Sequence, residues 1–196
     1  MIVNLHGFNS AGNNNTADQL RSHFEPGIRV ISPSYTVHNY ARGMSELRAV
    51  LAGVRRFPRE RPWLFVGSST GAVFAEMLAR EMGGGIVAVN PVTDPGILEG
   101  ALGWNSNYRT QLRYLFSRED LDTFQAVEHD LTLSRLVLVE AGDPVIDHRL
   151  TASFYQGAAH YIEYPGDSHR FTFFAEALPE IEKFYRGLEG GLPNGG

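Results

Sequence analysis

The feature that most constrains this chain is the segment from Trp63 to Met82, which reads WLFVGSSTG followed by AVFAEMLAREM. The short apolar run predicts a buried strand, and the apolar residues at helical spacing after it predict an amphipathic helix. Between them lies the pattern Gly67-x-Ser69-x-Gly71. A serine between small residues in a sharp strand-to-helix turn is typical of a nucleophile elbow, which exposes the hydroxyl above a sheet. We therefore predict that Ser69 is a nucleophile; the alternative is a tight turn with an inert serine.

Short apolar runs recur along the chain, with helix-periodic segments between them. We expect six strands, over Ile2–Leu5, Arg29–Ile31, Trp63–Val66, Ile86–Val89, Leu136–Glu140 and Ala159–Glu163. We expect helices over Thr16–Phe24, Gly43–Phe57, Ala72–Met82, His148–Gln156 and Phe171–Tyr185. This alternation predicts a compact α/β fold, with a mainly parallel sheet and helices on both faces. In such sheets ligands bind at the carboxyl ends of the strands.

Length and composition favour one domain over residues 1–189, since 196 residues with 43% hydrophobic content can bury a full core. Residues 190–196, GGLPNGG, are expected to be a flexible tail. The net charge of −5 and the scattered arginines disfavour nucleic acid as a partner. The absence of cysteine excludes thiolate chemistry. The first residues match neither a signal peptide nor a membrane span, so we expect a cytoplasmic protein.

The stretch between residues 90 and 135 interrupts the regular alternation. It is longer than a usual connection plus one helix, and it carries the aromatic residues Trp104, Tyr108, Tyr114, Phe116 and Phe124. Residues 95–130 are consistent with a small lid or a substrate wall, but the aromatics could equally pack one or two ordinary helices onto the body. The sequence leaves both alternatives open. On the first alternative, Trp104 and Tyr108 are the candidate substrate-binding residues.

A serine hydroxyl needs a base to remove its proton and a third group to orient that base. Of the seven histidines, His169 lies in the loop directly after the last predicted strand, so it is the predicted base. Asp143 follows the preceding strand through a glycine turn and is the predicted acid. Asp147 is the alternative, but its position is more typical of a helix N-cap. Asp167 shares the loop of His169 and is expected to shape that turn.

Two backbone amides are candidates for an oxyanion hole. One belongs to Thr70, at the start of the helix after the serine, and the other to Phe8, in the loop after the first strand. We expect the neighbouring His6 to brace this loop rather than to act in catalysis. Histidine and carboxylate pairs at ligand spacing are absent from the sequence, so we expect no metal and no cofactor.

Seven motifs, in order along nearly the whole chain, resemble the small YqiA-like bacterial esterases of the α/β-hydrolase superfamily. They are LHGFNS at 5–10, SPSY at 32–35, VGSSTG at 66–71, NPVTDP at 90–95, LGWNSNY at 102–108, GDPVIDHR at 142–149 and GDSHRF at 166–171. The resemblance implies a compact single-domain hydrolase that lacks the first two strands of the full superfamily sheet and cleaves short acyl esters. By position, the family's catalytic residues fall on Ser69, Asp143 and His169. Such proteins often carry an apolar residue where this chain has Thr70, a change that leaves the backbone amide in place.

These observations lead to one functional prediction and two alternatives. We predict a serine hydrolase that cleaves carboxylic esters of small or short acyl substrates through an acyl-enzyme, with Ser69, His169 and Asp143 as the triad. A thioesterase or acyl transferase with the same triad is one alternative, and a non-catalytic hydrolase-like binding module is the other. The expected partner is a small-molecule ester or thioester, and the sequence leaves the oligomeric state open.

Overall fold

The computed structural model describes residues 1–54, 62–124, 130 and 132–190. Its centre is a six-stranded sheet in the order β2-β1-β3-β4-β7-β8, in which all neighbouring strands are parallel. The strands are β1 (Ile2–Leu5), β2 (Val30–Ile31), β3 (Leu64–Ser68), β4 (Gly85–Val89), β7 (Arg135–Glu140) and β8 (His160–Tyr164). The predicted fold class, a mainly parallel α/β sheet of about six strands, is confirmed.

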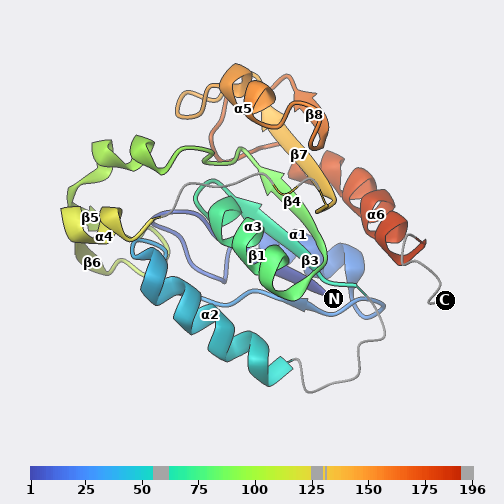
Figure 1. Ribbon diagram of the computed structural model, residues 1–196, viewed down its shortest axis with the longest axis horizontal. Coiled ribbons are helices and arrows are strands. Elements are labelled where there is room, and N and C mark those ends of the chain that lie inside the picture. The colour runs from blue at the N-terminus through green and yellow to red at the C-terminus, as the bar shows by residue number, and fades with distance from the viewer. Residues whose placement is uncertain (55–61, 125–129, 131, 191–196) are drawn as a thin grey trace.

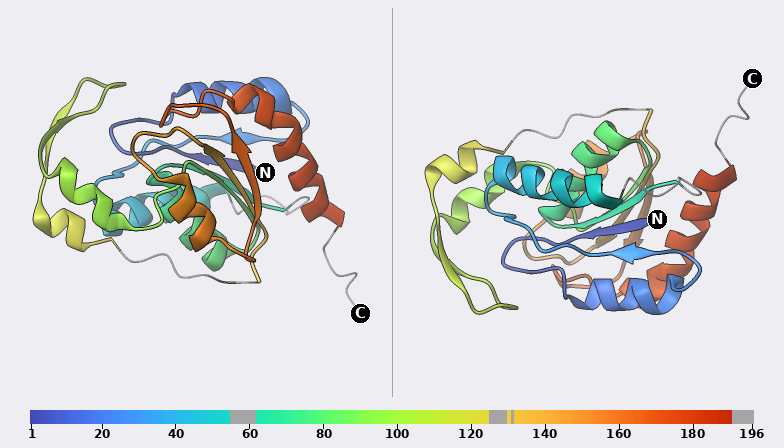
Figure 2. Two further views of the ribbon diagram at one scale, coloured as in Figure 1. Left: turned by 90° about the horizontal axis from the view of Figure 1, so that it is seen from above. Right: turned by 90° about the horizontal axis from the view of Figure 1, so that it is seen from below.

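Helices cover both faces of the sheet, as predicted (Figures 1 and 2). They are α1 (Asn15–Phe24), α2 (Tyr40–Val54), α3 (Gly71–Met82), α5 (His148–Phe154) and α6 (Phe174–Gly190). The first and last of these, α1 and α6, lie on one face, and α2, α3 and α5 lie on the other (Figure 2). The sheet is therefore enclosed, which leaves its carboxyl edge as the open end where a site can form.

Alternate residues along each strand face the two helical layers. On β3, Phe65 belongs to the core beneath α2 and α3, whereas Leu64 and Val66 belong to the core beneath α1 and α6. All three are fully buried. Burial of such a side chain contributes about 1.5–3 kcal/mol, so these two apolar layers hold the strand ends in fixed positions. Strands buried on both faces also explain the nearly continuous apolar runs in the sequence.

The last helix begins later than predicted. The apolar spacing suggests a start at Phe171, but α6 begins at Phe174 and continues to Gly190. Phe171 has a φ of +53°, and the amide of Thr172 donates to the carboxylate of Glu140. This contact holds the chain in a turn ahead of the helix. Residues 55–57 of the second predicted helix and 191–196 of the predicted tail lie outside the described residues.

The segment after β4 forms a small unit beyond the carboxyl edge of the sheet (Figure 2). It contains the 3₁₀ helix η1 (Pro95–Ala101), an antiparallel hairpin of β5 (Gly103–Ser106) and β6 (Arg113–Phe116), and α4 (Arg118–Asp122). The hairpin is absent from the predicted elements, because each strand has only four residues and the motif depends on their pairing. Leu98, Phe116 and Leu121 form its own core, against which Phe8 and Phe124 pack.

Candidate active site

Ser69 lies in the sharp turn between β3 and α3. Its φ of +54° is in the left-handed region, which a residue other than glycine rarely adopts. Its amide donates to the carbonyl of Val89 at 2.9 Å, which ties the turn to the neighbouring strand. A Cβ on Gly67 would overlap the carbonyl oxygen of Gly71, and one on Gly71 would overlap that of Leu5. The two glycines of the motif are therefore required by close backbone packing around the serine.

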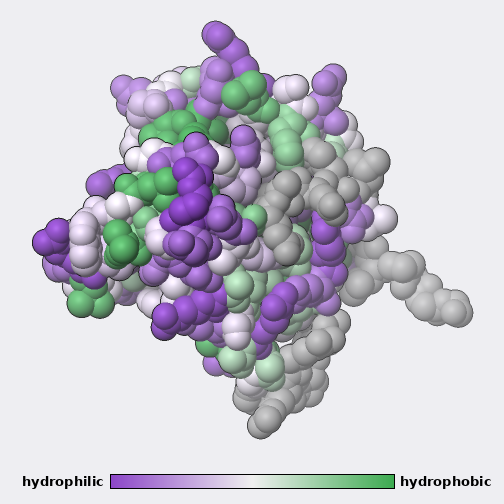
Figure 3. Space-filling view, turned by 60° about the vertical axis from the view of Figure 1, so that its left-hand side comes forward, coloured by the Kyte–Doolittle hydropathy of each residue, from purple (hydrophilic) through white to green (hydrophobic). Residues whose placement is uncertain are grey.

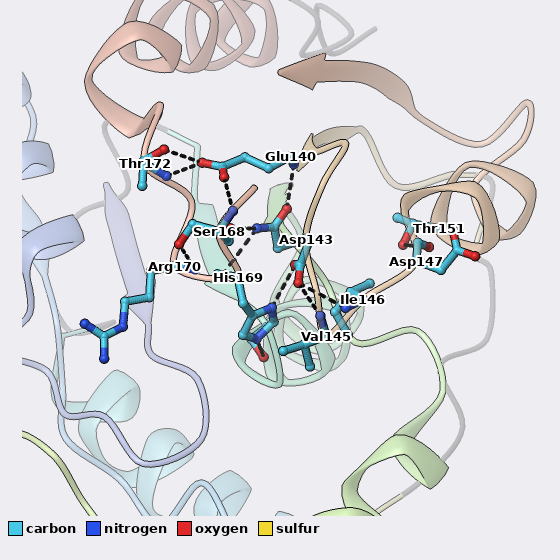
Figure 4. Close-up of polar contacts among 12 residues, drawn as sticks. Glu140, Asp143, Val145, Ile146, Asp147, Thr151, Ser168, His169, Arg170 and Thr172 are labelled. Atoms are coloured by element: carbon cyan, nitrogen blue, oxygen red, sulfur yellow. Dashed lines mark hydrogen bonds and ion pairs between the residues drawn. The ribbon is translucent and has the colours of Figure 1, made fainter. Parts of the chain in front are cut away.

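His169 connects the serine to an aspartate. Its Nε2 lies 2.9 Å from the Oγ of Ser69. Its Nδ1 lies 2.8 Å from the Oδ2 of Asp143, a contact drawn in Figure 4. The three side chains come from the loops after β8, β3 and β7, and so meet at one edge of the sheet. A hydrogen bond from the Nδ1 of His169 to Asp143 leaves Nε2 free to accept the proton of the serine.

Asp143 is held more tightly than the other two side chains. Its side chain is 1% exposed, and its Oδ1 accepts the amides of Val145 at 2.8 Å and Ile146 at 3.1 Å. Burial opposes ionisation of this carboxyl, but the hydrogen bonds from His169 and from both amides outweigh burial, so its pKa lies below the usual value. The carboxylate is therefore ionised at neutral pH and can stabilise a positive charge on His169.

The other two aspartates considered from the sequence have different places. Asp147 is the N-cap of α5, where its side chain accepts the amide of Arg149 at 2.9 Å, as predicted. Asp167 is exposed on the loop of His169. Neither carboxylate contacts the imidazole, so Asp143 is the acid that the structure brings to His169.

A buried pair that the sequence analysis did not select, Asn90 and Glu140, braces the loop of His169. Asn90 donates from Nδ2 to the carbonyls of Ser168 at 3.1 Å and His169 at 3.3 Å, and its Oδ1 accepts the amide of Glu140 at 2.9 Å. Glu140 is fully buried, and its carboxylate accepts the Ser168 amide at 2.7 Å and both the amide and the hydroxyl of Thr172 (Figure 4).

The sequence does contain one signal for this pair. Glu140 ends the otherwise apolar strand LVLVE, and a buried carboxylate must find hydrogen-bond donors. The donors come from a loop about thirty residues away, so the pattern alone does not identify them. Space in this region is also limited, since a Cβ on Gly166 would overlap the Glu140 carboxyl group.

Phe8 and Thr70, whose amides are predicted to form the oxyanion hole, both line the cleft beside Ser69. Neither the Phe8 amide nor the Thr70 amide donates a hydrogen bond to any residue that the structure describes. The loop can approach the elbow because Gly7 has no side chain; a Cβ there would lie 2.9 Å from the carbonyl oxygen of Ser68. Unpaired amides beside a serine hydroxyl are suited to binding a developing oxyanion.

His6 is a buried structural residue beneath this loop. Its Nδ1 lies 3.0 Å from the carbonyl of Gly7, and its Nε2 accepts the amide of Tyr35 at 3.4 Å. The Tyr35 hydroxyl in turn donates to the His6 carbonyl at 2.7 Å. Burial lowers the pKa of His6 to about 4, so the ring is neutral at physiological pH. These contacts agree with a bracing role.

The cleft has a volume of about 700 Å³ and contains Ser69 and His169. Its walls come from the loop after β1, the start of α1, η1 and the tip of the hairpin. Tyr108 lines it, but Trp104 does not: Trp104 is 68% exposed and lies opposite Leu115 on the outward face of the hairpin. The position of Trp104 therefore does not support the substrate contact expected from the sequence.

The described residues contain no cluster of three histidine, aspartate or glutamate side chains that could hold a metal ion. Among the helices described, none is both long and apolar enough to cross a membrane.

The sheet order and the elbow place this protein in the α/β-hydrolase fold. Its sequence matches the model of the uncharacterised protein family UPF0227 over residues 1–186, so the chain belongs to that family, and the resemblance to YqiA-like proteins is confirmed. No curated protein matches it significantly.

Solved structures from several organisms have a similar fold. Est1E from Butyrivibrio proteoclasticus has a TM-score of 0.77 at 14% identity, over 95% of this chain and 87% of that one. Alpha/beta hydrolase domain-containing protein 10 from mouse has a TM-score of 0.70 at 15% identity, over 95% and 90%. A pyrethroid hydrolase from Sphingobium faniae JZ-2 has a TM-score of 0.69 at 16% identity, over 94% and 96%. At these identities the likeness establishes the fold.

Proposed function

We propose that this protein is a serine hydrolase that cleaves carboxylic esters with small or short acyl groups. The observation that carries the proposal is the continuous hydrogen-bonded chain from Ser69 through His169 to Asp143. It lies in a cleft that Phe8 and Thr70 also line, and the amides of these two residues donate to no described residue. A nucleophile, a base, an orienting acid and oxyanion donors together suit acyl transfer. Two structural neighbours of this chain are named a pyrethroid hydrolase and a thermophilic esterase, and these names support a hydrolase by analogy.

In the first half of the reaction the acyl group moves to the enzyme. The Oγ of Ser69 attacks the ester carbonyl carbon while the Nε2 of His169 takes the hydroxyl proton. The carbonyl oxygen becomes an oxyanion that the Phe8 and Thr70 amides bind. Asp143 stabilises the imidazolium. Collapse of the tetrahedral intermediate breaks the bond to the alcohol oxygen, which receives the proton from His169.

In the second half, water releases the acid. His169 takes a proton from a water molecule as its oxygen attacks the acyl-enzyme carbonyl, and the same two amides bind the second oxyanion. The intermediate collapses with loss of the Ser69 oxygen, which recovers its proton from His169. The enzyme returns to its starting state, and the mechanism uses no cofactor.

We also propose that residues 1–189 form one domain, in which the segment 95–130 contributes a wall for the substrate.

A fluorophosphonate probe followed by peptide mapping tests the proposal directly. We expect the probe to label Ser69, because it reacts with serines activated by a base. Ser69→Ala should abolish labelling and lower kcat by about 10⁴- to 10⁶-fold. Ser45→Ala, at an exposed site on α2, is the control and should label normally. An unlabelled wild-type protein would instead indicate a binding module.

The leaving group requires a second experiment. Oxygen esters, thioesters and acyl acceptors all suit the same triad, so a panel of esters and thioesters with graded acyl length should be assayed with and without an added alcohol. A higher kcat/KM for oxygen esters, with free acid as the main product, is the expected result. A preference for thioesters, or transfer to the alcohol as the main outcome, would redirect the assignment to a thioesterase or an acyl transferase.

A further inference from the structure

Two arginines line the cleft beside Ser69. Arg109 and Arg170 both line it, and its described lining includes no aspartate or glutamate. Neither arginine forms an ion pair with a residue that the structure describes. The chain as a whole has a net charge of −5, and some exposed arginines have acidic partners, as Arg48 does in Glu81 and Arg118 in Glu99. Two guanidinium groups that form no ion pair with a described residue therefore lie at one cleft.

Each of these guanidinium groups is held against another residue of the cleft. Arg109 donates from Nη2 to the Oδ1 of Asn15 at 2.7 Å. The guanidinium carbon of Arg170 lies 5.3 Å from the centre of the Tyr108 ring, a cation–π arrangement. Both Asn15 and Tyr108 line the same cleft. These contacts reduce the freedom of two long side chains and leave most of their N–H donors available.

Arg170 is also adjacent in sequence to the predicted base. The side chains of His169 and Arg170 leave their loop in different directions, so the guanidinium extends away from the contact with Asp143 (Figure 4). The braces on this loop therefore position a cation as well as the imidazole. An acyl group attached to Ser69 would extend through a cleft that both arginines line.

We propose that the preferred substrate carries a second, anionic oxygen group, a carboxylate or a phosphate, which Arg109 and Arg170 bind. This inference rests on the proposed ester hydrolysis and names its substrate class. Guanidinium groups match the paired oxygens of both anions, and such charge-assisted bonds are stronger than neutral ones. The anionic group does not react; it orients the ester in the cleft, so its effect is expressed in kcat/KM.

The test compares substrates that differ only in this charge. The anionic substrates are the mono-p-nitrophenyl esters of succinate, glutarate and adipate. Each is compared with its neutral counterpart, the mixed diester in which the other carboxylate is a methyl ester. The readout is the ratio of kcat/KM for the anionic member to that for the neutral member, from p-nitrophenolate release after subtraction of the uncatalysed rate. We expect a ratio above one at one or more chain lengths, and a decrease in this ratio as salt is added.

Variants assign the effect to the two arginines. Arg170→Gln and Arg109→Gln should each lower the ratio about five- to tenfold. Arg113→Gln is a matched control, because the Arg113 guanidinium carbon also lies 5.3 Å from an aromatic ring centre, that of Trp104, but outside the cleft. This control should leave the ratio unchanged. Competition by glutarate and by inorganic phosphate then distinguishes the carboxylate from the phosphate as the preferred group.

Several results would overturn the inference. These are a ratio at or below one for every chain length, an unchanged ratio in both cleft variants, or an equal decrease in Arg113→Gln. Another outcome is that Ser69→Ala abolishes hydrolysis of neutral esters while the arginine variants leave the ratio unchanged. In that case the inferred substrate class is wrong and the proposed esterase function stands. If no ester is hydrolysed and the probe leaves Ser69 unlabelled, the proposed function itself fails.

Discussion

The two sides of the cleft differ in how firmly their side chains are held. On the side built by the sheet, Asp143 is 1% exposed and His169 is 26% exposed, and every polar contact between them and Ser69 is short. On the side built by the hairpin, Tyr108 is 49% exposed. The hairpin side also presents a mixed surface of apolar and polar residues (Figure 3).

This difference shows which part of the fold suits reaction chemistry and which suits substrate choice. Reaction chemistry requires fixed geometry, and the ends of buried strands supply it. Substrate choice tolerates exposed side chains, because each contact changes the affinity by only a modest amount. Changes on the sheet side should therefore alter the rate or the stability strongly, and changes on the hairpin side should mainly alter preference. The predictions below test that contrast.

The largest expected effect is that of Asp143→Asn. The amide cannot hold His169 in the tautomer that accepts the serine proton, and the same change lowers kcat by about 10⁴ in a serine protease. Asp147→Asn is the matched control, since asparagine also caps helices, and it should be mild. Ester hydrolysis by the two purified variants decides between them. If Asp147→Asn were the more damaging change, the acid would be misassigned.

The next effect concerns the brace beneath the loop of His169. Glu140→Gln places an NH₂ group against the amides of Ser168 or Thr172, so donors face donors and one remains unpaired. We expect a loss of about 1–3 kcal/mol in the free energy of unfolding. The shifted loop should also lower kcat/KM by about ten- to a hundredfold, through misplacement of the base.

A neighbouring glutamate provides the control for this brace. Glu163→Gln changes an exposed carboxylate on β8 and should leave both the unfolding free energy and kcat/KM close to wild type. Urea unfolding and ester kinetics measure the two quantities. Full activity in a clearly destabilised Glu140→Gln protein would show that Glu140 supports the fold without positioning the base.

The third effect is a dependence of stability on pH. Because burial lowers the folded-state pKa of His6 to about 4, the unfolded chain binds a proton more readily below its own pKa of about 6.5. The stability that the folded protein gains from the neutral, buried His6 is fully present above pH 6.5 and is lost as the pH falls toward 4. It should make the protein about 2 kcal/mol less stable at pH 5 than at pH 7.

The variant His6→Gln isolates this contribution from those of other titrating groups. Glutamine binds no proton in this range, so the difference in unfolding free energy between pH 7 and pH 5 should shrink by about the same 2 kcal/mol. Urea midpoints at both pH values are the measurement. An equal pH dependence in the two proteins would mean that another group causes the loss.

The smallest effect is expected on the hairpin side. Tyr108→Ala removes a ring from the cleft wall, and that ring is also the partner of Arg170. The variant should change the discrimination between acyl chain lengths by about 1 kcal/mol, or about fivefold in relative kcat/KM. Its melting temperature should stay close to wild type, because the ring is half exposed. Trp104→Ala, outside the cleft, is the control. A lowered melting temperature with an unchanged chain-length profile would assign Tyr108 to packing.

The sequence alone determined the sheet, the elbow and the triad residues that the structure brings together. Each depends on local patterns, since apolar runs mark buried strands, and Ser69, Asp143 and His169 each lie in the loop after a strand. Parallel strands align their carboxyl ends, so residues that follow them converge without further information. This is why Ser69 and His169, a hundred positions apart, could be paired before any coordinates were known.

Only the tertiary structure decided the outer side of the cleft and the brace behind it. Strand register in the hairpin turned Trp104 outward, opposite Leu115, although nothing in its neighbouring residues distinguishes it from Tyr108. Likewise Arg109 and Arg170 reach one cleft, and Glu140 meets Thr172, only after the loops close over the sheet. Periodicity reports which face of one element is buried, but it carries no information on which distant loop will supply a partner.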